Sequence, residues 1–98
     1  EEYCASRGYG LVRNYCGHGI GREVHESPEI PNWGRAGHGP RLVAGMTICI
    51  EPMINVKGDD VKTLKDGWTV VTKSGSLSAH FEHAIAITPD GPVILTEP

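Results

Sequence analysis

The sequence predicts an α+β chain in which a curved antiparallel sheet is accompanied by the remnant of one helix. After Gly8 the apolar residues mostly alternate with polar ones, as in strands, and short turn sequences separate the alternating runs. The only helical pattern lies in residues 1–7. With 98 residues, 39% of them hydrophobic, the chain is large enough for a single domain, which we take as residues 1–98.

Residues 1–7 are typical of the last turns of a helix. Arg7 is favourable near a helix C-terminus, and Gly8 suits the left-handed position that ends one. No capping residue precedes the segment. We therefore expect a fragment that begins inside a helix; the alternative is a complete small domain that opens on a frayed helix.

The strands are expected at alternating runs, and their ends at proline and glycine. Pro52 should end or bend one strand because it cannot donate to a ladder. The segment 26–45, rich in proline and glycine, is expected to be a long loop. The predicted strands are 9–16, running into a glycine turn, 46–51, 68–72, 77–88 and 93–95, with turns at 57–60, 73–75 and 89–91.

Composition excludes several classes of partner. A formal net charge of -3 without a cluster of lysine and arginine argues against nucleic acid and anionic membranes. No apolar run is as long as a transmembrane helix, and no signal peptide opens the chain. Cys4, Cys16 and Cys49 are an odd, widely spaced set without a Cys-x-x-Cys pair, which indicates reduced thiols and a cytoplasmic location.

His18 and His25 are the first candidates for chemistry. Glycines 17 and 19 flank His18, and glycine allows the backbone to approach closely whatever the imidazole binds. His25 is a second titratable, metal-capable group seven residues later. A dinucleotide loop is a poor alternative, because Arg22 stands where the third glycine of G-x-G-x-x-G belongs.

Glu51 and Glu82 are the second pair of candidates. Glu82 is expected in mid-strand, where a carboxylate is disfavoured and needs a cation if it is buried. Glu51 ends an apolar strand and is fixed by Pro52. Each glutamate taken singly has an equally good alternative, as a solvated side chain or a partner of a nearby lysine.

Together, His18, Glu51 and Glu82 form a ligand set for a divalent ion of manganese, iron, cobalt or zinc. Glutamates can bridge, so a two-metal centre that activates water is plausible. His25, expected at a distance, would then bind substrate or a developing oxyanion. Alternatively, His18, His25 and one glutamate would hold a single ion.

The other histidines have less specific predictions. His38 is expected at the surface in a glycine-rich loop. His83 falls on the apolar face of its strand and is expected to be a packed core residue. His80 shares the face of Glu82 and would support the metal ligands from behind.

The chain closely resembles the C-terminal half of bacterial type I methionine aminopeptidases, which are pita-bread metallopeptidases of the M24 family. The resemblance covers nearly the whole chain and rests on the motifs at residues 15–21, 25–26, 45–53, 65–69 and 77–83. Prolidase and aminopeptidase P share the first histidine motif, but they usually carry an Arg-x-Glu-Asp type segment where this chain has Phe81-Glu82-His83. The resemblance implies one half of a pita-bread fold.

The resemblance also implies a function, the removal of the initiator methionine from nascent proteins by a metal-dependent exopeptidase. His18, Glu51 and Glu82 would bind two divalent ions (cobalt, manganese, iron or zinc), with Glu82 bridging and Glu51 also handling the proton of the attacking water. His25 would contact the scissile peptide. Val24 and Trp68 would lie near the methionine pocket, although some relatives have an aromatic residue in place of Val24.

The family's remaining ligands, two aspartates, and a further catalytic histidine belong to the N-terminal half. The chain alone is therefore expected to be nearly inactive and to bind metal weakly. The implied partners are peptides with N-terminal methionine, nascent chains and, as a further candidate, the ribosome. The complete protein is expected to be a monomer. Residues 1–98 alone are expected to self-associate through an uncovered sheet edge. A non-catalytic binding module of the same fold is the alternative, but such relatives typically lose metal ligands, whereas the three expected here are present.

Overall fold

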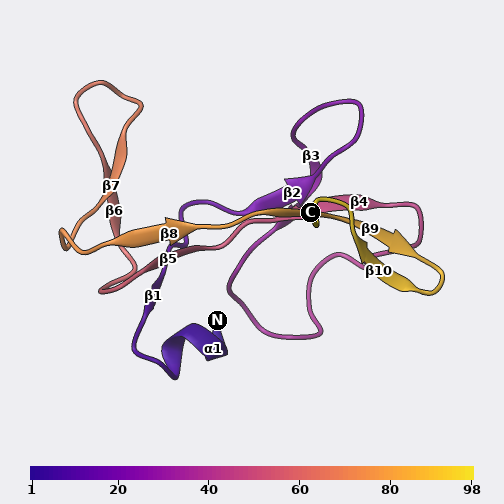
Figure 1. The fold of residues 1–98 in the computed structure, drawn as a ribbon, viewed down its shortest axis with the longest axis horizontal. Coiled ribbons are helices and arrows are strands. Elements are labelled where there is room, and N and C mark those ends of the chain that lie inside the picture. The colour runs from indigo at the N-terminus through magenta and orange to yellow at the C-terminus, as the bar shows by residue number, and fades with distance from the viewer.

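The computed structural model describes residues 1–98 as two antiparallel sheets arranged end to end, with a short helix and a projecting two-stranded hairpin (Figure 1). One sheet has the order β1-β5-β8, the second β10-β9-β4-β2-β3, and β6-β7 form the hairpin. The elements are α1 (Glu2–Ala5), β1 (Gly10–Leu11), β2 (Gly17–Gly19), β3 (Glu26–Ile30), β4 (Thr47–Ile50), β5 (Met53–Asn55), β6 (Val61–Thr63), β7 (Val70–Thr72), β8 (Ser78–His80), β9 (His83–Thr88) and β10 (Gly91–Ile94).

The chain passes between the two sheets twice, from β4 to β5 and from β8 to β9. These two passages lie side by side, and their pairing keeps the same register in both sheets. In the first sheet, β5 pairs with β8 so that Met53 faces His80. In the second, β4 pairs with β9 so that Ile50 faces His83. Because these two pairs belong to the same register, the residues between them, Glu51 and Glu82, also occupy facing positions.

Pro52 interrupts the hydrogen-bond ladder, although not the register, because it has no N–H to donate. The N–H of Phe81 donates to the Pro52 carbonyl oxygen at 3.3 Å, and no reciprocal bond can form. The predicted strand 77–88 is therefore two strands, β8 and β9. Glu82 lies at the break between them, so the prediction that it stands in mid-strand is wrong.

The glycine run is itself a strand, so the predicted strand 9–16 followed by a glycine turn is also wrong. Within that range only β1 is a strand, and Gly17–Gly19 form β2. A Cβ on Gly17 would lie 2.0 Å from the Cys49 carbonyl oxygen, and one on Gly19 would lie 2.1 Å from that of Ser27. Glycine is needed here because neighbouring strands approach closely on both sides of His18.

Most other sequence predictions hold with shifted boundaries. The N-terminal helix ends as expected, and Gly8 has a φ of 76°. The predicted 46–51 strand, the 68–72 strand and the final hairpin correspond to β4, β7 and β9–β10. The predicted loop 26–45 begins with β3, and the sequence analysis missed β5 and β6.

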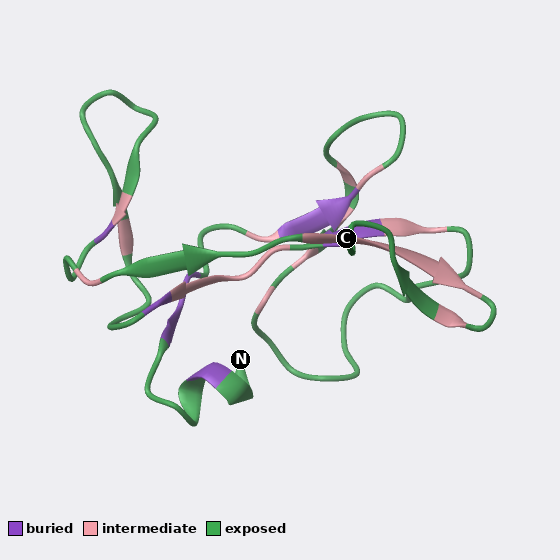
Figure 2. Cartoon of the chain, viewed as in Figure 1, coloured by how far each residue is buried: buried purple, intermediate pink, exposed green.

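The core is small and lies where the strands cross the middle of the molecule. Eleven of 98 residues are buried, chiefly on β1, β2 and the middle of β4, while the hairpins and loops are mostly exposed (Figure 2). The radius of gyration of 14.8 Å exceeds the value of about 13 Å expected for a compact domain of this length. Large parts of the sheet faces therefore remain open in residues 1–98. No helix is long and apolar enough to cross a membrane.

The close approach at β2 makes a stability prediction. Gly17→Ala should lower the free energy of unfolding by about 2 kcal/mol or more, because the added methyl group meets backbone that cannot move independently. Gly21→Ala is the matched control, since its methyl group would meet only the flexible Glu26 carboxylate. Thermal unfolding should show a decrease of several degrees for Gly17→Ala alone; equal decreases for both variants would contradict the account.

Candidate metal centre

His18 lies at the centre of the second sheet with a defined orientation. Its side chain is buried, and its Nδ1 lies 2.8 Å from the carbonyl oxygen of Gly19. Because a carbonyl oxygen only accepts, Nδ1 carries the proton and donates it. The second ring nitrogen, Nε2, lies 3.2 Å from Glu51 Oε2. A ring fixed in this way presents Nε2 to a ligand site, as metal-binding histidines do.

Glu51 and Glu82 bring two carboxylates to that site. Glu51 follows β4, its side chain is 13% exposed, and it faces Glu82 in the shared register. A ligand atom of Glu82, one of His18 and one of Cys49 lie within 4.8 Å of one another. Like charges directly opposite each other on a sheet are destabilising, so this arrangement calls for a cation.

Cys49 is the site residue that the sequence analysis missed. It pairs with His18 on one side and Ala84 on the other. Burial, a hydrogen bond to Glu82 and the charges of Glu82 and Glu51 raise the pKa of the Cys49 thiol to about 11. Cys49 is thus a neutral thiol that donates to a carboxylate. The available signal was its position two residues before Glu51, on the same face of the predicted strand.

His25 lies much closer to His18 than predicted. The two ring centroids are 4.2 Å apart with an interplanar angle of 47°. The reason is that β3 folds back on β2 so that Glu26 pairs with Gly19, which brings the preceding residue next to His18. His25 is exposed whereas His18 is buried, so His25 is accessible from solvent beside the cluster.

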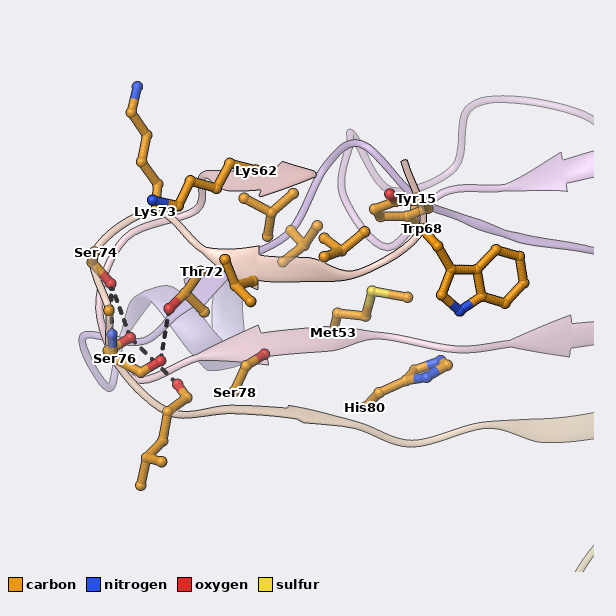
Figure 3. Close-up of a pocket in the computed structure, with 16 residues that line it drawn as sticks. Tyr15, Met53, Lys62, Trp68, Thr72, Lys73, Ser74, Ser76, Ser78 and His80 are labelled. Atoms are coloured by element: carbon orange, nitrogen blue, oxygen red, sulfur yellow. Dashed lines mark hydrogen bonds between the residues drawn. The ribbon is translucent and has the colours of Figure 1, made fainter. Parts of the chain in front are cut away.

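Trp68 and Val24 are not brought together in a common pocket. Trp68 is 88% exposed and lines a cavity of about 950 Å³ with Tyr15, Met53 and His80. The Trp68 indole projects from the end of the β6–β7 hairpin towards the Met53 and His80 side chains (Figure 3). Val24 is 67% exposed and lines neither the Trp68 cavity nor the cavity of about 340 Å³ beside His18 and His25.

The turn that carries Trp68 is fixed by Asp66. The Asp66 carboxylate accepts hydrogen bonds from the backbone N–H groups of Trp68 and Thr69, each at 2.9 Å, and from the Thr69 hydroxyl. The hydroxyl bond, followed by the two backbone bonds, lowers the pKa of Asp66. Residues 66–69 are therefore a locally ordered turn with an exposed indole.

The remaining histidines differ partly from their predictions. His38 is exposed, as expected. His80 is exposed and lines the Trp68 cavity. His83 is only half-buried, so the core prediction is wrong; its Nδ1 lies 2.8 Å from Thr96 Oγ1, and its ring packs edge-on against Phe81.

Comparison with known proteins decides the family. The model of metallopeptidase family M24 matches residues 1–89. The chain belongs to this family. Over 98% of the length of residues 1–98, the sequence is 58% identical to the methionine aminopeptidase of Clostridium perfringens. Its fold superimposes on methionine aminopeptidases from Rickettsia prowazekii (TM-score 0.94, 49% identity, 98% of this chain) and Thermotoga maritima (TM-score 0.94, 50% identity, 99% of this chain).

These findings confirm the resemblance and the pita-bread architecture predicted from the motifs. The chain spans 39% of the length of the Clostridium perfringens relative and of both structures. Membership of family M24 also implies that a divalent metal is used.

The residues present fit such a metal. His18 Nε2 makes no contact other than that with Glu51, and the two glutamates occupy facing register positions with no lysine or arginine paired to either. One imidazole with two carboxylates is a donor set for hard or borderline divalent ions. Cys49 completes the cluster geometrically, but its high pKa disfavours the thiolate that a metal requires.

Replacing one carboxylate should change metal binding and metal-free stability in opposite directions. Glu82→Gln should weaken binding of Mn²⁺ or Co²⁺ at least about tenfold. It should also raise the free energy of unfolding of the metal-free protein by about 0.5 kcal/mol, because the facing charge is removed. Calorimetric metal titration and thermal unfolding measure the two effects. Cys49→Ala is the control and should leave metal affinity unchanged; a large loss there would instead make Cys49 a ligand.

The Asp66 turn should respond to acid. Because its pKa is lowered in the folded state, the hydrogen bonds that Asp66 accepts stabilise the turn above the ordinary value of 3.8. They are lost as the pH falls below 3.8 and through the lowered pKa. A carbon-13 NMR titration should place the carboxyl pKa below 3.8, with Thr69→Val raising it and Thr63→Val leaving it unchanged. A pKa at or above 3.8 in the unmodified protein would contradict this role.

Proposed function

We propose that residues 1–98 are the C-terminal part of the catalytic domain of a methionine aminopeptidase, which removes the initiator methionine from nascent proteins. The observation that carries the proposal is the pairing of Glu51 with Glu82 beside the fixed imidazole of His18. It occurs in a chain 58% identical to a methionine aminopeptidase over nearly its whole length. A non-catalytic module of this fold has no need for two unneutralised facing carboxylates.

The proposed cofactor is a pair of divalent ions of cobalt, manganese, iron or zinc. His18, Glu51 and Glu82 would hold them. Two aspartates outside residues 1–98 would supply the remaining ligands. The open sheet faces support this division, because only eleven residues are buried when the chain is taken alone.

Each site residue then has a role that follows from its place. When bound, the ions would polarise the scissile carbonyl and lower the pKa of the attacking water. A carboxylate oxygen of Glu51 would accept the proton of that water. His25, exposed beside His18, would donate a ring N–H to the scissile peptide and stabilise the developing oxyanion.

The proposed substrates are peptides and nascent chains that begin with methionine. Trp68 would contact the substrate; in support, the cavity that it lines also includes Met53 and His80, each two residues from a candidate ligand in the chain. Val24, which is exposed and precedes His25 in the chain, would also contact it. We also propose a cytoplasmic location, supported by three free cysteines, the ribosome as a partner, and a complete protein that is monomeric, whereas residues 1–98 alone self-associate.

A second candidate is a mononuclear centre that uses His18, His25 and one glutamate. The short distance between the two histidine rings favours it. The two candidates differ in the effect of His25→Ala. Metal should be retained and peptide cleavage lost if His25 contacts substrate, whereas metal should be lost if His25 is a ligand.

The proposed activity can be tested by supplying the rest of the enzyme. Residues 1–98 alone should release little or no methionine from Met-Ala-Ser with Mn²⁺ or Co²⁺, since the ligand set is partial. A chimera with the preceding part of the Clostridium perfringens enzyme should release methionine readily, as 58% identity predicts compatible packing. Released methionine is measured by chromatography.

Variants of the chimera provide the controls. Glu82→Gln should abolish methionine release together with metal binding, and His25→Ala should abolish release alone. A folded, metal-loaded chimera without activity would contradict the proposed function. Full activity of residues 1–98 alone would contradict the proposal that two of the metal ligands lie outside these residues.

A further inference from the structure

A threonine hydroxyl closes the β9–β10 hairpin at the end next to Glu82. The register of this hairpin pairs Ile94 with Ile85, and the next N–H, that of Leu95, donates to the Ala84 carbonyl oxygen at 2.8 Å. In a regular ladder the Ala84 N–H would donate back to Leu95. Instead it donates to Thr96 Oγ1 at 3.2 Å.

The same hydroxyl also fixes the residue that follows Glu82. Thr96 Oγ1 lies 2.8 Å from His83 Nδ1, and the His83 ring packs edge-on against Phe81 with centroids 4.9 Å apart. Phe81 and His83, the two neighbours of Glu82 in the chain, are therefore held against each other. The Thr96 hydroxyl thus restrains the His83 ring, in addition to the pairing of His83 with Ile50 of β4.

Glu82 needs such an anchor because its backbone is weakly held on the other side. It lies between β8 and β9 and is exposed. The preceding residue, Phe81, faces Pro52, which cannot donate, and the one bond of that pair, from the Phe81 N–H to the Pro52 carbonyl oxygen, is long at 3.3 Å. The backbone at Glu82 therefore lies at a gap between two strands, with weak ladder bonding on its N-terminal side.

We propose that Thr96 is a positioning residue for the metal centre: through Ala84 and His83 it fixes the start of β9 and so holds the Glu82 carboxylate opposite Glu51. This inference rests on the proposed role of Glu82 as a metal ligand. Figure 1 shows the C-terminal end of the chain over the junction of the two sheets, in agreement with these contacts. Partners behind a ligand typically change metal affinity about 10- to 100-fold.

The hairpin contains a matched control at its other end. The Thr88 hydroxyl also makes two hydrogen bonds, donating to the Gly91 carbonyl oxygen and accepting from the Asp90 N–H. Thr88→Val and Thr96→Val remove the same groups from the same hairpin. Only Thr96 is near Glu82. If both hydroxyls act only on hairpin stability, the two variants should change metal affinity equally; if Thr96 positions Glu82, only Thr96→Val should lower it.

The test compares the two variants in residues 1–98 and in the metallopeptidase chimera. Thr96→Val should lower the affinity for Co²⁺ about tenfold, by calorimetry, while Thr88→Val leaves it within twofold and lowers the melting temperature by a similar amount. Thr96→Ser, which keeps the hydroxyl, should restore the affinity. Equal losses of affinity in both valine variants, or none in either, would overturn the proposal.

A second measurement keeps the inference separate from the proposed function. Hydrogen exchange of the metal-free protein should show faster exchange at the amides of Glu82, His83 and Ala84 in Thr96→Val than in Thr88→Val. If this difference appears but the unmodified protein binds no metal, the positioning of Glu82 stands and the proposed function fails. If the unmodified protein binds metal and the exchange rates of the two variants do not differ, the positioning role fails.

Discussion

The structure depends on one register that runs unbroken through both sheets and places Glu51 opposite Glu82. On one side of these glutamates Met53 faces His80, and on the other Ile50 faces His83. Facing carboxylates repel each other, so the register creates a site that is destabilising until a cation occupies it. The same alignment brings together β4 and β9, whose paired residues lie about 30 positions apart in sequence. The imidazole of His18, on the neighbouring strand β2, lies beside them.

The local sequence around each ligand serves this arrangement. Glycines on either side of His18 let β2 approach the β4 and β3 backbones, and the Gly19 carbonyl oxygen fixes the imidazole. Pro52 interrupts the ladder one position beyond the glutamates, where it faces Phe81 and cannot donate. Next to Glu82, the Ala84 N–H donates to the Thr96 hydroxyl of the adjacent hairpin in place of a backbone carbonyl.

Sequence reasoning singled out the candidate ligands because their signals are local. A histidine between glycines and a glutamate followed by proline stand out without any knowledge of pairing, and alternation located the strand before Glu51. It missed β5 and β6 because three residues are too few to show a period. The role of Cys49 and the closeness of His25 to His18 depend on which strands become neighbours, and no local pattern encodes that. The split of the predicted strand 77–88 has the same origin, since Pro52 acts on it from the partner strand.

The central claim is that an ion belongs between Glu51 and Glu82, with His18 as its nitrogen ligand. The most direct measurement is a crystal of the protein soaked in Mn²⁺, examined by anomalous diffraction. The account predicts an anomalous peak between the two facing carboxylates and within coordinating distance of His18 Nε2. No peak at saturating Mn²⁺, or a peak bound to Cys49 Sγ in place of Glu51, would contradict it.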